Sequence, residues 1–333
     1  MLHKITKMIA VAGVALSASF ASAQETVRIA HSTESFAFLP LFAAVTSGAF
    51  EDAGVTPEII RAGSGSKTVA ALVGRSADIA VGSTASVLFA RKEGLDLRMV
   101  SGLVTQYSSS IVYSKEWAES KGVTADSSYE DMLTAMRGAR IATSGPGGGD
   151  HIIRYFAGEA GLDPDSDLTI VYLGKDIGVY QAAIEEGRID GISLSAPTPQ
   201  IAVRERDAVF AFNTGAGEVE ALDGFLYIVA TARGDWIDDN PELAQKVMQG
   251  FENGLEQIRN PETTNDTRDS VYAQYYSDVE KDLFDDIWSQ FAAGTPESAT
   301  ITRDAIMRVV EFTNAFETDN PIDPAAVEGS FIQ

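Results

Sequence analysis

The sequence contains no cysteine, which removes several kinds of structure and chemistry at once. Disulfide bonds, thiolate zinc sites, iron–sulfur clusters and cysteine nucleophiles are all excluded. Basic residues are also scarce, since 25 Lys and Arg stand against 48 Asp and Glu, which gives a formal net charge of -23. Proteins that bind the phosphate backbone of nucleic acids need clustered Lys and Arg, so we expect no nucleic-acid partner.

Long apolar runs are likewise absent, apart from one short stretch near the N-terminus. Lys4 and Lys7 precede an apolar stretch over residues 8–20, which is too short to span a bilayer. The sequence Ala21-Ser22-Ala23 follows and matches a signal-peptidase cleavage site. We therefore predict that residues 1–23 are a cleavable signal peptide, with cleavage after Ala23 and export to the periplasm. Because no cysteine follows this site, we expect no lipoprotein anchor.

The remaining chain predicts two lobes of α/β structure. A chain of 333 residues exceeds the ~250–300 residues at which one core stops growing, so two lobes are expected. Short apolar strands alternate with segments of helical spacing, and this alternation is typical of parallel βαβ units. The predicted strands are Thr26–Ala30, Thr56–Arg61, Asp78–Gly82, Leu97–Leu103, Ser109–Ser114, Ala139–Thr143, Leu168–Leu173, Ile189–Leu194, Ala208–Phe212 and Phe225–Thr231.

Helices follow these strands until the C-terminal region, where the pattern becomes helical only. The strand pattern restarts after Gln106, so we expect the chain to cross between lobes near Thr105 and again near Thr214. Residues 24–105 and 214–333 then form lobe 1, and residues 106–213 form lobe 2. The predicted helices are Leu39–Phe50, a helix after Gly63–Ser66 with apolar residues at Val69, Leu72 and Val73, Ser83–Lys92, Lys115–Lys121, Tyr129–Met136, His151–Ala160, Val179–Glu186, a helix that opens at Ser195-Ala196-Pro197, a helix with apolar residues at Leu243, Val247, Phe251 and Leu255, then Asp266–Tyr276, Glu280–Ala293 and Thr300–Phe316.

Small polar residues follow the predicted strands, at the edge where open parallel sheets bind ligands. Free N–H groups and helix dipoles at such ends favour an anionic group, and small side chains let it approach the backbone. The alternative is that these residues only cap helices and form turns. Several convergent turns in a two-lobed chain favour a cleft. The segments are His31–Phe38, Gly63–Ser66, Ser83–Ser86, Tyr107–Ser110, Ser144–Asp150 and Ser195.

Catalytic signatures are incomplete throughout the chain. Ser144–Asp150 is glycine-rich, but it lacks the last Gly of G-x-G-x-x-G and the Gly-Lys of a P-loop. Ser64–Lys67 matches S-x-x-K, yet the S-D-N and K-T-G partners of that motif do not occur. His31 and His151 are the histidines outside the predicted signal peptide, and their spacing supports neither a metal site nor a triad. We therefore predict no catalytic residues, no metal and no cofactor.

Four segments in a fixed order carry a family resemblance: Ser47–Gly54, Ala77–Ser83, Met136–Ala142 with the glycine-rich turn behind it, and Ala182–Gly191. The chain resembles the periplasmic substrate-binding proteins of ABC transporters, in the nitrate/sulfonate/taurine-type family. The resemblance implies a two-lobed type II periplasmic binding protein fold of the α/β class. Each lobe is then a mostly parallel sheet flanked by helices, with two crossover segments, a helical C-terminal region, a ligand in the cleft and hinged closure.

The resemblance also implies a set of candidate ligand-binding residues. The family's cleft positions, together with the polar turn at Ser66, correspond to Ser32, Glu34, Phe36, Phe38, Ser66, Ser83, Thr84, Tyr107, Ser144, Gly147, Gly148, Gly149, Asp150 and Ser195. Phe36, Phe38 and Tyr107 supply either aromatic faces to a ligand or side chains to the core. We expect a small organic acid, sulfonate- or carboxylate-like or aromatic, held by backbone N–H groups. Glu34 and Asp150 favour a cationic or heterocyclic amine if both face the ligand.

Several functions remain open at this point. The leading hypothesis is a monomeric, non-enzymatic binding protein that delivers its ligand to an ABC permease driven by a separate ATPase. One alternative is a sensory binding protein of the same fold, and another is a binder of pyrimidine- or thiamine-precursor-type heterocycles. An enzyme of pyrimidine synthesis, which a related eukaryotic family builds on this fold, needs a reactive His or Lys in the cleft and is less favoured.

Overall fold

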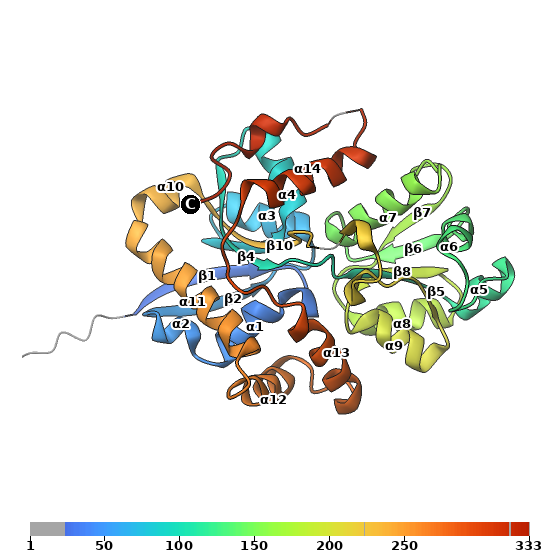
Figure 1. Cartoon of the computed structure of the whole chain (residues 1–333), viewed down its shortest axis with the longest axis horizontal. Coiled ribbons are helices and arrows are strands. Elements are labelled where there is room, and N and C mark those ends of the chain that lie inside the picture. Colours follow the sequence, from blue (N-terminus) through green and yellow to red (C-terminus); the bar gives the residue numbers. More distant parts are fainter. Residues whose placement is uncertain (1–23, 223, 320, 333) are drawn as a thin grey trace, which may run out of the picture.

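The computed structural model describes residues 24–222, 224–319 and 321–332, and the predicted signal peptide lies outside these residues. Two five-stranded sheets lie side by side along the long axis of the molecule (Figure 1). We call the half with the first sheet lobe 1 and the half with the second sheet lobe 2. The chain crosses from lobe 1 to lobe 2 after β4 and returns before β10, so lobe 1 is discontinuous in sequence.

Each sheet is mostly parallel, with one antiparallel strand inside it. The order in lobe 1 is β2-β1-β3-β10-β4, and β10 runs antiparallel to β3 and β4. The order in lobe 2 is β7-β6-β8-β5-β9, and β5 runs antiparallel to β8 and β9. The strands are β1 (Glu25–His31), β2 (Val55–Arg61), β3 (Ile79–Ser83), β4 (Leu97–Val104), β5 (Ser109–Tyr113), β6 (Arg140–Thr143), β7 (Thr169–Tyr172), β8 (Gly191–Ser195), β9 (Val209–Phe212) and β10 (Ile228–Arg233).

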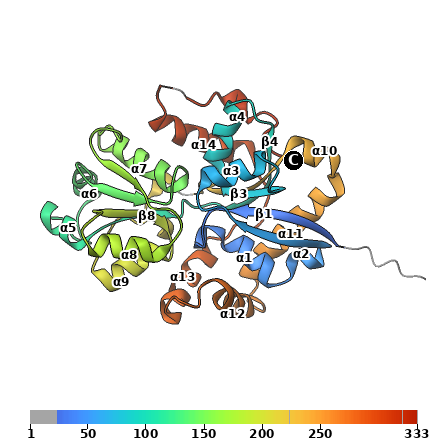
Figure 2. The ribbon, with the colours of Figure 1, turned by 180° about the vertical axis from the view of Figure 1, so that it is seen from behind.

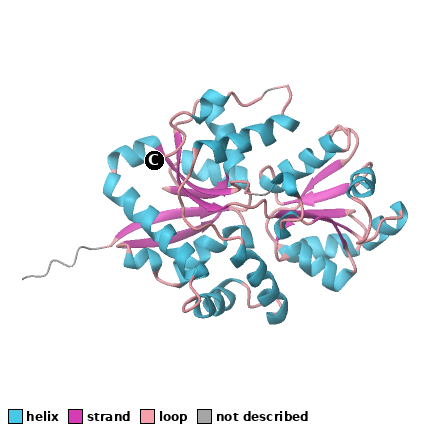
Figure 3. Cartoon of the chain, viewed as in Figure 1, coloured by secondary structure: helices cyan, strands magenta, loops and turns pink. Residues whose placement is uncertain are grey.

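Helices cover both faces of each sheet, which is why the central strands β5 and β10 are buried along their whole length (Figure 3). Figure 2 shows the same layers from behind, with α3 and β3 near the viewer. The helices are α1 (Leu39–Thr46), α2 (Ala49–Asp52), α3 (Gly65–Val73), α4 (Thr84–Lys92), α5 (Lys115–Lys121), α6 (Tyr129–Ala135), α7 (Gly148–Glu159), α8 (Ile177–Glu185), α9 (Thr198–Arg206), α10 (Gly234–Asp239), α11 (Pro241–Arg259), α12 (Thr264–Tyr275), α13 (Lys281–Ala293) and α14 (Arg303–Phe316). Short 3-10 turns lie at Phe36–Phe38, Thr214–Ala216, Glu220–Leu222 and Pro324–Val327.

Two predicted helix boundaries were wrong, and one helix was missed. The predicted helix Leu39–Phe50 is two helices, because Gly48 takes a left-handed conformation (φ 78°) between α1 and α2. The helix predicted to begin at His151 begins at Gly148 instead, inside the glycine-rich turn. The short helix α10 was not predicted at all.

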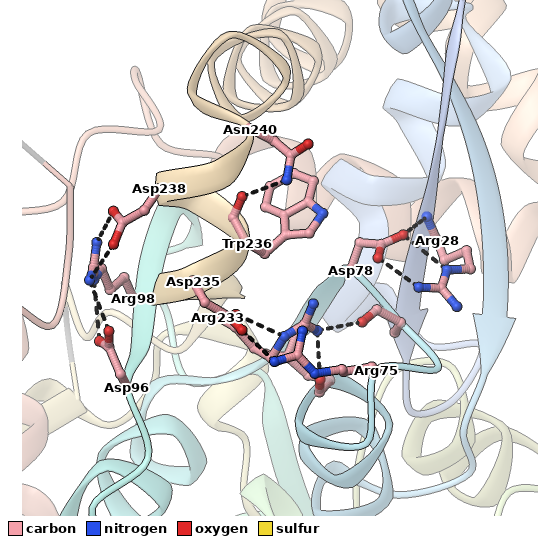
Figure 4. Close-up of polar contacts among 12 residues, drawn as sticks. Arg28, Arg75, Asp78, Asp96, Arg98, Arg233, Asp235, Trp236, Asp238 and Asn240 are labelled. Carbon is pink, nitrogen blue, oxygen red and sulfur yellow. Dashed lines mark hydrogen bonds and ion pairs between the residues drawn. The ribbon is translucent and has the colours of Figure 1, made fainter.

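An Arg–Asp pair ties together neighbouring parallel strands in each lobe. In lobe 1, Arg28 donates to Asp78 through Nε (3.0 Å) and Nη2 (2.7 Å) (Figure 4). In lobe 2, Arg140 donates to Asp190 in the same way, through Nε (2.8 Å) and Nη2 (2.7 Å). Burial opposes ionisation of Asp78, but the hydrogen bonds from Arg28 outweigh it and lower the pKa of this carboxyl. The pairs therefore bind β1 and β6 to the residues just before β3 and β8, at the ends of those two strands that lie away from the other lobe.

A second ionic cluster fixes α10 against lobe 1. Arg233 is buried and donates to the carbonyls of Leu72 (2.8 Å) and Ala77 (3.0 Å), and it also pairs with Asp235 (Figure 4). Arg98 binds Asp96 and Asp238 on the other side of the helix. These contacts are structural, because they lie at the outer end of the sheet in lobe 1.

Close helix packing holds the C-terminal helices to lobe 1. α11 lies against α1 and α2, and it presents Gly250 and Gly254 to them. A Cβ atom at Gly254 would lie 2.5 Å from the Cβ of Ala44 and 3.0 Å from the carbonyl of Pro40. The glycine is therefore needed for the close approach of the two helices.

We predict that Gly254→Ala lowers the free energy of unfolding by about 1–3 kcal/mol, because the added methyl group overpacks the contact with α1. The matched control is Gly178→Ala in α8, where no atom lies within 4 Å of the new Cβ. Helix propensity predicts a gain of up to about 1 kcal/mol for that control. Urea denaturation of both variants measures the difference, and equal effects would contradict the packing argument.

Candidate functional site

A pocket lies between the lobes, where the carboxyl ends of β1, β3, β6 and β8 meet. The cavity volume, measured as the space that the centre of a water-sized sphere can occupy, is about 50 Å³. A water molecule needs roughly 10–15 Å³ by this measure, so the enclosed space suits a group of a few heavy atoms. The lining residues are Ser32, Thr33, Ser35, Ala37, Phe38, Gly65, Gly82, Ser83, Ser109, Ser144, Gly147, Gly148, Gly149, Leu194, Ser195, Tyr227 and Ile228.

The pocket wall is neutral, although the chain is strongly acidic. Hydroxyl groups, glycine backbone and a few apolar side chains form it, and none of the lining residues named above is charged. Helices α3, α4 and α7 begin at this wall, with Ser64, Ser83 and Gly147 as their N-caps. The first N–H groups of a helix have no partner within it, and they carry the positive end of its dipole. The pocket therefore offers N–H donors and a positive local field.

The glycine-rich turn brings α7 close to the other walls. A Cβ atom at Gly148 would overlap the hydroxyl of Tyr227, and one at Gly149 would overlap Thr143 and lie 2.7 Å from the Ser193 carbonyl. Gly147 has φ 145° and would place a Cβ 3.3 Å from the Cα of Gly65. No other residue fits these three positions without displacement of the walls.

Hydroxyl groups form a connected floor beneath the pocket. Ser195 Oγ lies 3.2 Å from both Ser108 Oγ and Ser109 Oγ, and Ser109 Oγ lies 2.8 Å from the hydroxyl oxygen of Tyr227. A hydroxyl group can both donate and accept, so these four groups form a continuous set of hydrogen bonds. Burial raises the pKa of Tyr227 to about 12, so its hydroxyl keeps its proton near neutral pH.

Direct contacts between the lobes surround the pocket. The N–H of Ser66 in lobe 1 donates to the Pro146 carbonyl in lobe 2 (3.2 Å). On the other side, the N–H of Phe36 donates to the Ala196 carbonyl (2.9 Å). Arg61 donates to the Lys175 carbonyl (3.2 Å), again across the two lobes.

More than half of the candidate ligand-binding residues lie on the pocket wall. These residues are Ser32, Phe38, Ser83, Ser144, Gly147, Gly148, Gly149 and Ser195. Their side chains or backbone therefore lie where a ligand in the pocket would contact them.

The two acidic candidates do not line this pocket. Glu34 forms an ion pair with Arg61 (3.1 Å). Asp150 is buried and accepts hydrogen bonds from Arg154 (3.1 Å) and the Tyr172 hydroxyl (2.9 Å). Both carboxylates are thus already partnered within the protein.

Four other candidates support the pocket without lining it. Phe36 is fully buried and packs on aromatic rings of the C-terminal helices, with 4.9 Å between its centroid and that of Tyr276. Thr84 is also fully buried and donates to the Leu226 carbonyl (2.7 Å). Ser66 lies in the first turn of α3, and its Oγ is 3.2 Å from Ser64 Oγ. Tyr107 is buried behind the glycine turn.

Tyr227 is the pocket residue that sequence reasoning missed most clearly. It lies just before β10, and the apolar run Phe225–Thr231 predicted only a buried strand there. Its carbonyl accepts the N–H of Thr84 at the start of α4 (2.9 Å), and its hydroxyl joins the pocket floor. No local signal distinguishes such a residue from a core tyrosine, because its role depends on the return of the chain to lobe 1. Leu194 and Ile228 were missed as well, because the apolar runs that contain them predicted only buried strands.

Residues 24–222, 224–319 and 321–332 contain neither a cluster of metal-ligating side chains nor a helix that could span a membrane. Among these residues no group of three or more His, Cys, Asp and Glu could hold a metal ion. In that same part of the chain, no helix has the length and apolar character that crossing a membrane requires.

Comparison with known proteins identifies the family. A family model described as the NMT1-like family matches residues 22–268, which is most of the chain. The chain belongs to the NMT1-like family. Among curated proteins, no sequence matches this NMT1-like chain.

Solved structures resemble this NMT1-like protein over nearly its whole length. A protein of Bordetella bronchiseptica RB50 has a TM-score of 0.77 at 20% identity, covering 93% of this chain and 95% of that one. The alkanesulfonate-binding protein SsuA from Xanthomonas axonopodis pv. citri, bound to MOPS, has a TM-score of 0.73 at 14% identity, covering 94% and 99%. The periplasmic nitrate-binding protein NrtA from Synechocystis PCC 6803 has a TM-score of 0.69 at 17% identity, covering 92% and 86%.

These likenesses confirm the predicted fold class and the predicted family resemblance. The NMT1-like chain has the two-lobed type II periplasmic binding protein fold, in the group of structures that contains SsuA and NrtA. Its pocket occupies the cleft between the lobes of that fold.

Two buried histidines predict how stability depends on pH. Burial is the main cause that lowers the pKa of His31 and of His151 to about 4. The unfolded chain, with a histidine pKa near 6.5, binds protons first as the pH falls, so stability decreases between about pH 6.5 and pH 4. At pH 5 the loss is about 2 kcal/mol for each histidine.

His151→Phe isolates one of the two histidines, because the ring of His151 lies between Phe89 and Phe316. We expect the variant to lose about 2 kcal/mol less than the wild type between pH 7.5 and pH 5. Urea unfolding at the two pH values measures this, with His31 unchanged in both proteins. An unchanged pH dependence in the variant would show that His151 is not the titrating group.

Proposed function

We propose that this protein is the extracytoplasmic solute-binding component of an ABC importer. The observation that carries the proposal is the neutral, glycine- and hydroxyl-lined pocket between the lobes of a type II periplasmic binding protein fold. The chain captures one small solute in the pocket, closes around it as a monomer, and delivers it to a membrane permease that works with a separate ATPase. Residues 1–23 act as the signal peptide for export to the periplasm, residues 24–105 and 214–333 form lobe 1, and residues 106–213 form lobe 2.

The ligand in this proposal is a small organic anion with a sulfonate or carboxylate group. The N-termini of α3, α4 and α7 at the wall favour negative charge, and the neutral side chains do not oppose it. Glu34 and Asp150 are paired with Arg61 and Arg154, which weighs against the cationic or heterocyclic amine considered from the sequence. The proteins SsuA and NrtA, whose structures resemble this one, are described as alkanesulfonate- and nitrate-binding, which supports the same chemistry.

An enzyme of pyrimidine synthesis has less support than a binding protein. Its chemistry needs a reactive His or Lys in the cleft, and the residues that line the pocket include neither. A sensory binding protein of the same fold would use the same pocket, and only its partner would differ.

We expect anionic probes to stabilise the purified protein in a thermal-shift assay. MOPS, methanesulfonate, benzoate and nitrate serve as probes, with imidazolium and thiamine as cationic comparisons. A probe at 100 times its Kd adds about 2.7 kcal/mol to the stability of the native state, which raises Tm by several degrees. Stabilisation by the cations alone would contradict the proposed ligand class, and no stabilisation after removal of co-purified ligand would contradict the proposed function.

The pocket itself is tested by Gly148→Ala. The new methyl group would overlap the Tyr227 hydroxyl and displace the first turn of α7, so we expect the affinity for the stabilising probe to fall at least about tenfold. Gly158→Ala in the same helix is the control, because its new Cβ meets only the Ala315 carbonyl, at 3.9 Å. Titration calorimetry measures both variants. Equal affinities for the two folded variants would place the ligand elsewhere.

A further inference from the structure

Tyr107 lies behind the pocket, in the short segment where the chain first crosses between the lobes. Its side chain is buried and does not line the pocket. The ring packs on Tyr227 and Phe225 from the second crossing, at centroid distances of 4.2 and 5.2 Å, and on Phe312 of α14 at 5.3 Å. Tyr107 is therefore anchored where both crossings and the C-terminal helix meet.

The hydroxyl of Tyr107 reaches from this position to the glycine turn of lobe 2. It donates to the carbonyl of Gly148 with an oxygen–oxygen distance of 2.6 Å. The neighbouring carbonyl of Gly149 accepts a hydrogen bond from Ser193 Oγ at 2.7 Å. Two side-chain hydroxyls thus hold two successive carbonyls in the first turn of α7.

Holding these carbonyls also holds the N–H groups that face the pocket. The peptide unit is planar, so the Gly148 carbonyl and the Gly149 N–H turn together. N–H groups in the first turn of a helix have no partner within the helix and are free for a ligand. Three consecutive glycines restrict their own backbone very little, so an ordered turn at this position needs outside contacts.

We propose that Tyr107 is a positioning residue, which orients the pocket-facing N–H groups of α7 from the hinge without contacting the ligand. The inference rests on the proposed function for its ligand, but the contact it names can be tested without one. Because Tyr107 belongs to the crossing and Gly148 to lobe 2, the hydrogen bond ties the geometry of the hinge to the donors that a ligand meets.

The ligand-free test compares Tyr107→Phe with Tyr113→Phe by amide hydrogen exchange. Tyr113 is an equally buried tyrosine whose hydroxyl donates to the Met132 carbonyl (2.9 Å), away from the pocket. Exchange is followed in α7 from the His151 N–H, which donates to the Gly147 carbonyl (2.9 Å). We expect about fivefold faster exchange in Tyr107→Phe and wild-type exchange in Tyr113→Phe. Unchanged exchange in Tyr107→Phe, or equal acceleration in both variants, would overturn the proposal.

The ligand-dependent test separates affinity from stability. Each Tyr→Phe variant loses one buried hydrogen bond, so both should lose a similar free energy of unfolding. Only Tyr107→Phe should bind the stabilising probe more weakly, with a Kd about fivefold higher for a probe such as MOPS. Equal Kd values for the two variants would overturn the positioning role. If the wild type binds no probe, the proposed function fails while the exchange experiment still decides the role of Tyr107.

Should Tyr107→Phe not fold, Ser193→Ala serves as the second variant, because it removes the other side-chain hydrogen bond to the same turn. We expect it to give the same acceleration of exchange in α7. Wild-type exchange in that variant would overturn the proposal.

Discussion

The shape of the pocket depends on how closely the first turn of α7 approaches lobe 1 and the two tyrosines of the crossing segments, Tyr107 and Tyr227. Gly148 lies directly against the hydroxyl of Tyr227, and Gly147 lies against Gly65 across the gap between the lobes. Side chains at these positions would hold the lobes apart and fill the space that a ligand needs. The N-terminus of α7 therefore lies at the pocket wall with its first N–H groups, and the proposed binding mode relies on backbone and hydroxyl groups instead of a charged side chain.

This arrangement separates the charge of the protein from the charge of its pocket. The acidic residues that give the chain its formal net charge of -23 lie outside the lining of the pocket. Many of them are paired with arginine, as Asp78 is with Arg28 and Asp150 with Arg154. Exposed charges more than a Debye length of about 10 Å apart are screened at moderate salt, so local donors decide what the pocket accepts.

The strand and turn pattern of the sequence predicted the architecture because it is a local property. Apolar runs followed by Ser or Gly mark the strand ends, and Ser32, Ser83, Ser144 and Ser195 all lie on the pocket wall. Side-chain direction could not be predicted in the same way. Phe36 and Phe38 are two residues apart in one loop, yet Phe36 enters the core of lobe 1 while Phe38 faces the pocket. The partners of Glu34 and Asp150, and the approach of Tyr227, depend on segments that are distant in sequence.

The Arg–Asp pairs that fix the two sheets also relate the lobes to each other. In both lobes the arginine and the aspartate are 50 residues apart. In each lobe they also lie directly before the first paired residues of two parallel strands, which are β1 and β3 in lobe 1 and β6 and β8 in lobe 2. Ser32 follows Arg28 at the same spacing in sequence as Ser144 follows Arg140, so these two serines correspond. Ser83 likewise follows Asp78 at the same spacing as Ser195 follows Asp190. These four pocket-lining serines are therefore two pairs of equivalent positions, one member of each pair in each lobe. The two walls of the pocket therefore present the same kind of hydroxyl group, each just after or at the end of a corresponding strand.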